Sequence, residues 1–224
     1  MSYTVELKKI EPVTHDTNHL VFKRPEGFTF EPGQATDFSL DKDGWRDKKR
    51  PFTFVNLPES DTLEFVIKAY PDHDGVTEQI AQMKPGDHAI IEDPWGAIED
   101  EGPGTFIAGG AGITPFIAIL RERLEKKGTL AGCKLIFSNE TEKDIILRRE
   151  FETMPGLECV FTVTDQDTAD IETHRIDRAF LTQHIDPNFG HFYVCGPENM
   201  VDDITEQLKS LGVSEDRIVI EDLD

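Results

Sequence analysis

The sequence predicts two domains: an N-terminal antiparallel β-barrel over residues 1–99 and a C-terminal α/β domain with a parallel sheet over residues 100–224. Two observations support this prediction. In the first part, short strand-like runs follow one another with turn residues between them, which is typical of an antiparallel barrel. Beyond residue 100, strand-like and helix-like segments alternate, which indicates a parallel sheet.

The barrel is expected from six runs in which apolar and polar residues partly alternate. They read TVELKKIEPV, NHLVFKRP, QATDFSL, RPFTFVNL, TLEFVIKAY and DHAIIEDP. Turn residues such as Pro-Glu-Gly and Pro-Gly-Asp separate them. One segment, VTEQIAQM at 76–83, has a helical pattern instead.

The α/β domain is expected to begin after a short linker at 100–105. Its strand-like runs are TFIAGG, CKLIFSNE, LECVFTVT, HFYVCGP and RIVIEDL. Residues 115–127 place Phe116, Ile117, Leu120 and Leu124 on one helical face. A second helical segment at 199–212 ends with Gly212, which suits a helix C-terminus.

Composition excludes several classes of protein. The chain of 224 residues is 38% hydrophobic, so it can bury a core, and it has no apolar run of membrane-spanning length. Its N-terminus lacks a secretory pattern, so we expect a cytoplasmic protein. The formal charge of −21 opposes nucleic acid and anionic membranes as partners. Three widely spaced cysteines fit neither disulfides nor a metal site. Separately, we expect the protein to be a monomer.

Two motifs in the first half could bind an anionic aromatic ligand. In Arg50-Pro51-Phe52-Thr53, a guanidinium suits a phosphate, a ring can lie against a heterocycle, and a hydroxyl can form a hydrogen bond to a ring nitrogen. Gly75-Val76-Thr77 precedes a helix, whose first N–H groups can bind an anion. The alternatives are an ordinary strand and an ordinary helix start.

Two motifs in the second half lie where parallel strands end, at the sheet edge where ligands bind. In GGAGITP, Gly110 and Gly112 would let the backbone approach a ligand, and Pro115 suits the first turn of a helix. Pro115 also stands where a dinucleotide-binding fingerprint has its third glycine, so a plain strand-to-helix turn is the alternative. The run FYVCGPENM ends a later strand in Cys195-Gly196-Pro197.

The order of these four motifs across two domains resembles the ferredoxin–NADP reductase superfamily, and more closely its flavodoxin and ferredoxin reductase-like members without a ferredoxin domain. The resemblance covers nearly the whole chain. It starts at FEPGQ and includes the four motifs, FVIKAY at 65–70, and SNE at 138–140.

The resemblance implies a flavin on the barrel and NADH or NADPH as the electron donor on the second domain. We expect FAD in preference to FMN, because two separate anion sites, Arg50 and the helix start at Gly75–Thr77, suit a pyrophosphate better than one terminal phosphate. Thr53 and Cys195 would be the catalytic residues, and Arg50 would hold a flavin phosphate. The residues implied in cofactor binding are Arg50, Pro51, Phe52, Thr53, Ile67, Lys68, Tyr70, Gly75, Val76, Thr77, Gly110, Ala111, Gly112, Ile113, Thr114, Cys195, Gly196, Pro197 and Met200.

The chain departs from the family pattern at its end. Leu223 stands where some members carry a phenylalanine that covers the flavin, and Glu221 resembles an acidic residue near the flavin. No C-x₄-C-x₂-C iron–sulfur pattern occurs, so we expect electrons to pass to a separate carrier such as flavodoxin or ferredoxin. The alternatives are a flavin reductase or diaphorase that reduces free flavin or quinone, and a flavin-binding subunit without turnover.

Charge patterns suggest a donor and a docking site. Asp165, Asp167 and Asp170 precede Arg175 where the adenine ribose would be bound, which favours NADH over NADPH. The segment at 41–50, DKDGWRDKKR, has a net charge of +2 in an acidic chain and leads into the flavin motif. We expect it to dock the carrier, with Trp45 exposed; a solvated hairpin tip is the alternative.

Overall fold

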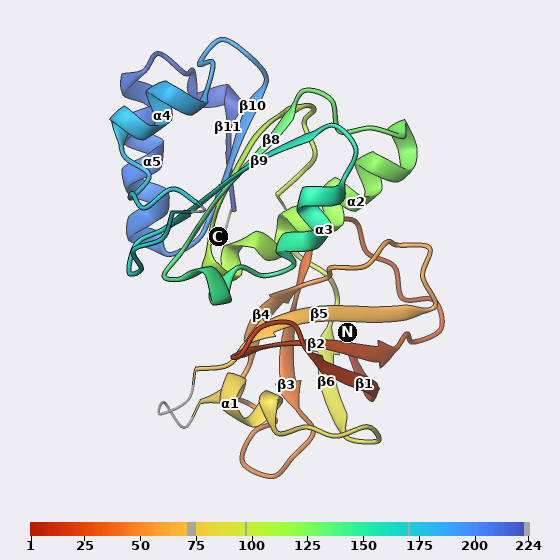
Figure 1. Cartoon of the computed structure of the whole chain (residues 1–224). Helices are drawn as coiled ribbons and strands as arrows, with labels where there is room; N and C mark the ends of the chain where they lie inside the picture. Colours follow the sequence, from red (N-terminus) through yellow and green to blue (C-terminus); the bar gives the residue numbers. More distant parts are fainter. Residues whose placement is uncertain (71–74, 97, 170, 222–224) are drawn as a thin grey trace.

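The computed structural model describes residues 1–70, 75–96, 98–169 and 171–221. Figure 1 shows two domains, one stacked on the other, with the N-terminus in the barrel and the C-terminus in the α/β domain. The barrel has the strands β1 (Ser2–Pro12), β2 (Thr17–Lys23), β3 (Ala35–Leu40), β4 (Arg50–Thr53), β5 (Thr62–Lys68) and β6 (His88–Glu92).

The barrel sheet is antiparallel and nearly closed. Its strand order is β4-β3-β6-β1-β2-β5, so β4 and β5 are the two edges. Directly beyond β4, the Val55 N–H donates to the Glu64 carbonyl on β5 at 2.9 Å and draws the edges together. Four phenylalanines, Phe22, Phe38, Phe54 and Phe65, are fully buried inside and pack ring against ring.

A short helix lies beside the barrel. α1 (Val76–Ala81) buries Val76 and Ile80 in the barrel core, which explains its apolar positions at i and i+4. Lys42 Nζ donates to Gln79 Oε1 at 2.9 Å, so the segment at 41–49 lies next to this helix.

The second domain contains a parallel sheet of five strands in the order β11-β10-β7-β8-β9. These are β7 (Gly104–Gly109), β8 (Cys133–Asn139), β9 (Leu157–Val163), β10 (His191–Cys195) and β11 (Ile218–Ile220). The connections include the α-helices α2 (Thr114–Lys127), α3 (Arg148–Thr153), α4 (Arg178–His184) and α5 (Glu198–Ser210), and the 3₁₀ turns η1 (Gly110–Ile113), η2 (Glu142–Asp144) and η3 (Glu215–Arg217).

Helices cover both faces of this sheet (Figure 1). Phe106 and Ala108 on β7 face one core with Phe116 and Leu120 of α2. Ile107, between them, faces a second core with residues of α4 and α5, because neighbouring side chains on a strand point to opposite faces. The runs of consecutive apolar residues in β7 and β8 follow from this burial on both sides.

The sequence predicted this fold class correctly. α2 spans Thr114–Lys127, has Pro115 in its first turn, and ends at Gly128, which has the left-handed φ of 72°. The helix expected at 199–212 is α5, and Gly212 follows it with a φ of 92°. The sequence pattern did not indicate the short helices α3 and α4, which have six and seven residues. The domain division at residue 99 stays a prediction.

The two domains share apolar and polar contacts. Val55 and Val66 of the barrel belong to the same buried cluster as Phe116 and Ile119 of α2. Arg121 on α2 donates from Nη1 to the Val55 carbonyl at 2.7 Å, while its Nε and Nη2 bind the Glu150 carboxylate. One guanidinium therefore ties α2 to α3 and to the barrel.

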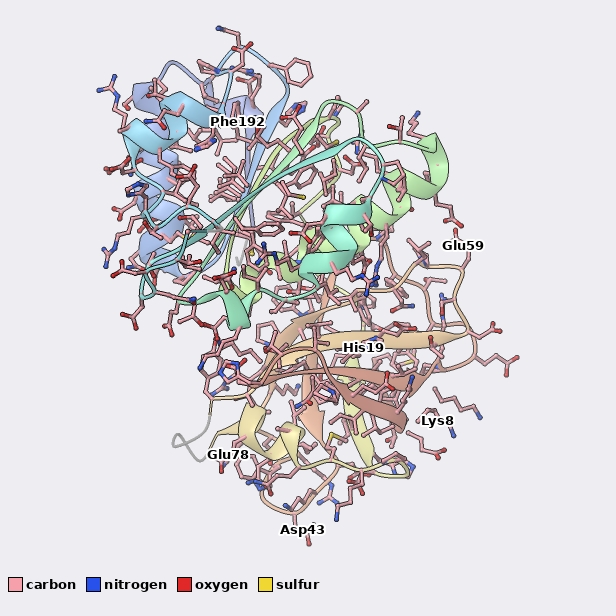
Figure 2. The ribbon with its side chains drawn as sticks, in the orientation of Figure 1. Lys8, His19, Asp43, Glu59, Glu78 and Phe192 are labelled. Carbon is pink, nitrogen blue, oxygen red and sulfur yellow. The ribbon has the colours of Figure 1, made fainter. Side chains whose placement is uncertain are left out.

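The segment at 41–49 differs from expectation at Trp45. The indole is half-buried and packs against the barrel core, so the prediction of an exposed Trp45 is wrong. Lys48 Nζ lies 4.0 Å from the centre of the Trp45 ring, and Arg46 forms ion pairs with Asp41 and Asp43. Figure 2 places Asp43 at the end of the barrel remote from the second domain.

In the described part of the chain, we find no helix that is both long and apolar enough to span a membrane.

Candidate active site

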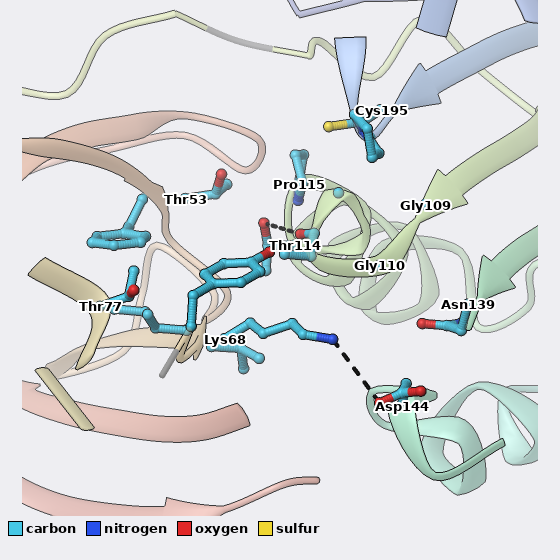
Figure 3. Close-up of a pocket in the computed structure, with 18 of the residues that line it drawn as sticks. Thr53, Lys68, Thr77, Gly109, Gly110, Thr114, Pro115, Asn139, Asp144 and Cys195 are labelled. Carbon is cyan, nitrogen blue, oxygen red and sulfur yellow. Dashed lines mark hydrogen bonds and ion pairs between the residues drawn. The ribbon is translucent and has the colours of Figure 1, made fainter. Parts of the chain in front are cut away.

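A cavity of about 930 Å³ lies between the two domains. Figure 3 shows that β4, β5 and α1 of the barrel face the glycine turn and the end of β10 across it. Fifteen of the residues predicted to bind cofactors or to act in catalysis line this cavity: Pro51, Phe52, Thr53, Ile67, Lys68, Tyr70, Thr77, Gly110, Ala111, Gly112, Thr114, Cys195, Gly196, Pro197 and Met200.

The barrel side offers an apolar wall with one hydroxyl. Phe52 and Thr53, at the end of β4, both line the cavity. The Phe52 ring packs edge to face against Phe38, with ring centres 5.6 Å apart. Thr53 is buried, and Ile67 and Val66 on β5 continue the apolar wall.

Arg50, Gly75 and Val76 do not line this cavity. The Arg50 side chain is exposed and donates to the Lys49 carbonyl at 2.7 Å. Val76 is a core residue, so only its backbone could contact a ligand. Gly75 is the N-cap residue of α1, and no side chain caps the first turn of this helix. The residues before it, 71–74, lie outside the described part of the chain. The predicted phosphate contacts of these residues stay predictions.

Gly110 and Gly112 in the glycine turn are glycines for different physical reasons. Gly110 has a left-handed φ of 52°, and the space where a Cβ would stand is open, which leaves room for a ligand beside the backbone. A Cβ on Gly112 would stand 2.5 Å from the Cys195 carbonyl oxygen. Gly112 is therefore required for packing against the end of β10, and its backbone also lines the cavity, so its expected contact with a ligand stays a prediction.

The remaining predicted residues of this turn divide between core and cavity. Ile113 is fully buried in the core and does not line the cavity. Thr114 lines the cavity, and its hydroxyl donates to the Ala111 carbonyl at 3.0 Å. The turn is a 3₁₀ helix that leads directly into α2, so its first N–H groups lack acceptors within the helix itself.

Cys195 is the last residue of β10 and is 7% exposed. Burial, with a smaller contribution from the charge of Glu221, raises the pKa of Cys195 to about 12. Cys195 Sγ lies 4.0 Å from Glu221 Oε2, and burial raises the pKa of the Glu221 carboxyl. The thiol is thus neutral at ordinary pH. Leu223, which stands where some members of the family carry a phenylalanine, lies outside the described residues.

An ionic cluster that was not predicted from the sequence joins the two domains beside the cavity. Lys68 Nζ lies 3.1 Å from Asp16 Oδ2 on the barrel and 4.0 Å from Asp144 Oδ1 on η2 (Figure 3 marks the second contact). Burial lowers the pKa of Lys68, but the hydrogen bond and charge of Asp16 and the charge of Asp144 raise it overall. No local pattern could have shown this cluster, since its members come from three distant segments.

His15 completes a group of possible metal ligands with Asp16 and Asp144. Its Nε2 lies 3.6 Å from Asp16 and 3.7 Å from Asp144. The Lys68 ammonium already lies between the two carboxylates. The expectation of no bound metal therefore stays a prediction.

A second set of missed residues lies at the ends of β8 and β9. Ser138, Asn139, Glu140 and Thr164 line the cavity. Asn139 is 5% exposed, and neither polar atom of its carboxamide has a hydrogen-bond partner among the described residues. The SNE motif at 138–140 was the sequence signal for this region, but it gave no reason to assign a role to its members.

These surroundings fit a flavin and a nicotinamide nucleotide. Phe52, Val66 and Ile67 provide an apolar wall for a flat heterocycle, and the Thr53 hydroxyl is a polar group at its edge. Gly110 leaves open space at the start of η1, where the first N–H groups of a helix can bind a phosphate. The chemistry of the lining therefore supports both expected cofactors.

Two family models match the chain in succession. The oxidoreductase FAD-binding domain family matches residues 4–99, and the oxidoreductase NAD-binding domain family matches residues 106–206. Together they cover nearly all of the barrel and most of the α/β domain. These matches confirm the expected FAD and a nicotinamide nucleotide.

Several curated proteins are similar in sequence. NADH-cytochrome b5 reductase 2 of Mycosarcoma maydis is 34% identical over 172 residues, which are 70% of this chain and 48% of that protein. NADH-cytochrome b5 reductase 2 of Candida glabrata is 28% identical over 96% of this chain and 82% of its own length. The plasma membrane-associated coenzyme Q6 reductase of Saccharomyces cerevisiae is 30% identical over 69% of this chain and 53% of its own length. The chain spans about half the length of the first and third.

Solved structures share the whole fold. A ferredoxin NADP⁺ reductase from Neisseria gonorrhoeae with bound FAD and NADP has a TM-score of 0.86 at 20% identity, over 98% of this chain and 97% of that one. The CS-b5R domains of human Ncb5or, in an NAD⁺ form, have a TM-score of 0.87 at 25% identity, over 98% of this chain and 69% of that one. The two domain matches, in this order, show that the chain belongs to the oxidoreductases that combine an FAD-binding with an NAD-binding domain, and its fold is the one found in the ferredoxin NADP⁺ reductase.

Proposed function

We propose that this protein transfers electrons from NADH, through its bound FAD, to a separate one-electron carrier, and that cytochrome b5 or a similar haem protein is the first candidate for that carrier. The observation that carries the proposal is the single cavity in which Phe52 and Thr53 of the barrel face Gly110 and Cys195 of the α/β domain. A donor nucleotide and a flavin can meet only where both domains contribute.

The chain's own residues bind and orient the two cofactors and exclude water from them. FAD supplies the redox chemistry when bound, because it can accept a hydride and release electrons one at a time. Phe52, Val66 and Ile67 hold a heterocycle against an apolar wall. The Thr53 hydroxyl can donate a hydrogen bond at its edge, and the neutral Cys195 thiol fills the opposite side. The transfer needs a fixed approach of two rings, so positioning is the main contribution of the protein.

Acidic residues in the α/β domain support NADH as the donor. A 2′-phosphate requires Arg or Lys near the end of the strand that binds the adenine ribose. Asp165 and Asp167 follow β9 and are exposed, and Lys68 is the one basic residue among the described residues of the cavity wall. Glu142 accepts hydrogen bonds from Gln166 Nε2 at 3.2 Å and Thr168 Oγ1 at 2.7 Å, which anchors the segment that carries both aspartates. The names of the relatives also support NADH.

The relatives' names also support the choice of carrier. Two of the similar proteins are NADH-cytochrome b5 reductases, whereas flavodoxin and ferredoxin were expected from the motif order alone. A second candidate is a quinone, which the coenzyme Q6 reductase of Saccharomyces cerevisiae favours. Flavodoxin or ferredoxin remains the third proposal.

The test begins with the purified protein and its FAD under anaerobic conditions. We expect one equivalent of NADH to bleach the flavin absorbance, with a larger kcat/KM for NADH than for NADPH. The reduced protein is then mixed with cytochrome b5, flavodoxin, ferredoxin or a water-soluble quinone, and each rate is measured by stopped flow. A flavin that NADH leaves oxidised would overturn the proposal, and a quinone rate above all three carrier rates would replace the carrier with a quinone.

A further inference from the structure

Four side chains from both domains meet beside the cavity, and three of them carry atoms that can coordinate a metal. His15 and Asp16 lie in the turn between β1 and β2 of the barrel, and Asp144 lies on η2 of the α/β domain. The ligand atoms of these three residues all lie within 4.8 Å of one another. Lys68 on β5 is the fourth member, and Figure 3 shows its ammonium extended towards Asp144. The cluster therefore spans the interface between the domains.

The two carboxylates are oriented by their own neighbours, which leaves one oxygen of each for the centre of the cluster. Asp16 Oδ1 accepts hydrogen bonds from Thr14 Oγ1 at 2.8 Å and from Thr17 Oγ1 at 3.1 Å. Asp144 Oδ2 accepts the Thr141 N–H at 2.9 Å and the Thr141 hydroxyl, and the Asp144 side chain is 6% exposed. Hydrogen bonds to the outer oxygen of a carboxylate orient ligands in the same way in metal sites.

His15 Nε2 lies at nearly equal distances from the two remaining oxygens, 3.6 Å from Asp16 Oδ2 and 3.7 Å from Asp144 Oδ1. In a tetrahedral zinc site with bonds of about 2.0 to 2.2 Å, neighbouring ligand atoms are about 3.3 Å apart, so modest side-chain rotations give this spacing. An imidazole nitrogen with two carboxylates suits zinc, whereas Mg²⁺ and Ca²⁺ prefer oxygen ligands. His15 is exposed, so an ion can enter from solvent.

Lys68 already places a positive charge at this point of the structure. Its Nζ lies 3.1 Å from Asp16 Oδ2 and 4.0 Å from Asp144 Oδ1, the same two oxygens that face His15. One ammonium compensates one of the two carboxylates, whereas a divalent ion compensates both. The Lys68 side chain lines the cavity and has a flexible four-carbon stem, so the ammonium can rotate away into the cavity. A formal charge of −21 on the chain also favours the binding of a cation.

We propose that Zn²⁺ binds at the domain interface through His15 Nε2, Asp16 Oδ2 and Asp144 Oδ1, in exchange for the Lys68 ammonium, and thereby inhibits the protein. Water completes the coordination of the ion. Bound zinc joins the barrel to the α/β domain, and the displaced Lys68 side chain occupies part of the cavity in which the cofactors meet. The binding step is independent of the proposed function, while the inhibition rests on it.

The experiment measures zinc binding to the FAD-loaded protein without NADH, by competition with a chromophoric chelator at constant neutral pH. We expect His15→Ala and Asp144→Asn each to raise the Kd of Zn²⁺ at least about 10-fold, because even the loss of a residue that only orients a ligand typically has an effect of this size. Asparagine at 144 keeps an oxygen for Thr141, so the local fold is retained. Lys68→Gln should lower the Kd, because the competing ammonium is removed.

His88→Ala is the matched control. His88 is exposed on β6 and lies outside the group of three possible ligands that the described residues form. We expect this variant to bind Zn²⁺ like the wild type, and excess Mg²⁺ to leave the Kd of Zn²⁺ unchanged. Zinc should slow NADH-dependent reduction of a dye by the wild type and by His88→Ala, and about 10-fold more zinc should be needed for His15→Ala. Each protein is compared with itself without zinc.

The contrary results separate the site from its consequences. A zinc affinity that neither His15→Ala nor Asp144→Asn lowers would place the ion elsewhere and overturn the proposal. An unchanged or weaker affinity in Lys68→Gln would overturn the exchange with the ammonium. Zinc bound at this site without any loss of NADH-dependent turnover would overturn the inhibition. A protein that binds zinc as expected but is not reduced by NADH would overturn the proposed function and support the zinc site.

Discussion

Cys195 combines a position beside the expected nicotinamide with a thiol that does not ionise. Burial is the main cause of the pKa of about 12, and the nearby Glu221 carboxylate adds to it. A thiol with a raised pKa is a poor nucleophile at neutral pH, since only the thiolate reacts. Cys195 therefore fits a role in packing and positioning, while proton transfer or covalent chemistry by this thiol does not follow from its surroundings.

We predict that replacing Cys195 with Ala leaves the pH profile of kcat for NADH-dependent reduction unchanged between pH 6 and pH 9. In the folded protein the thiol keeps its proton throughout this range, so its removal deletes no titration. The unfolded thiol ionises near pH 8.5, so the stability linked to this raised pKa is complete below about pH 8.5 and is lost as pH rises further. An inflection of the wild-type profile that disappears in Cys195→Ala would contradict the prediction.

The glycines illustrate what residue patterns can and cannot predict. The pair Gly110 and Gly112 marked the correct turn, because a strand followed by glycines and a helix has few other structures. The pattern could not distinguish a glycine that leaves space for a ligand from one that leaves space for the protein itself. Only the approach of the β10 end, far along the chain, shows that Gly112 is of the second kind.

At the scale of elements, α2 has a structural role in both domains. Its apolar face packs on β7, and its first turn follows the glycine turn at the cavity. Its polar side extends Arg121 to Glu150 on α3 and to the Val55 carbonyl on the barrel. Periodicity predicted the apolar face of α2, but the partners of Arg121 depend on how the domains pack and could not be predicted from the helix alone.

We predict that Arg121→Ala destabilises the protein by about 1.5 to 3 kcal/mol, the range for hydrogen bonds to charged groups. Arg121→Lys should recover only part of this loss, because an ammonium cannot bind a carboxylate through two parallel N–H groups and also reach Val55. The free energy of unfolding is measured by denaturant titration of the FAD-free protein. The control is Arg149→Ala, an exposed arginine on α3. Equal losses for Arg121→Ala and Arg149→Ala would contradict the prediction.

For the whole molecule, the sequence predicted the two-domain fold and most of the cavity wall, because the motifs are local and their order is informative. The contacts that join the domains were not predictable. Asp16, Lys68 and Asp144 are separated by more than fifty residues each and meet only in the folded protein. The burial of Trp45 was not predicted either, because this single aromatic residue lies in a charged segment.

Charge distribution bears on how the protein meets its carrier. The formal charge of −21 repels an acidic partner at long range, while the segment at 41–50 has a local charge of +2. The structure reduces the number of basic residues in this segment that could contact the carrier. Lys49 forms an ion pair with Glu92, and Arg46 with Asp41 and Asp43, so their charges are largely compensated. Lys48 is exposed and lies over the Trp45 ring, which makes it the residue to change.

We predict that Lys48→Glu slows electron transfer to the protein carrier and leaves the reduction of a neutral quinone unchanged. The matched control is Lys8→Glu on β1, away from this segment; Figure 2 shows Lys8 and Asp43 at separate places on the barrel. Each change lowers the formal charge from −21 to −23, so long-range repulsion increases equally in both variants. A slower rate in Lys48→Glu alone therefore reports a local contact. The difference should shrink as salt is raised through about 0.1 M, where screening acts over roughly 10 Å. Equal rates for the two variants would show that the carrier docks elsewhere.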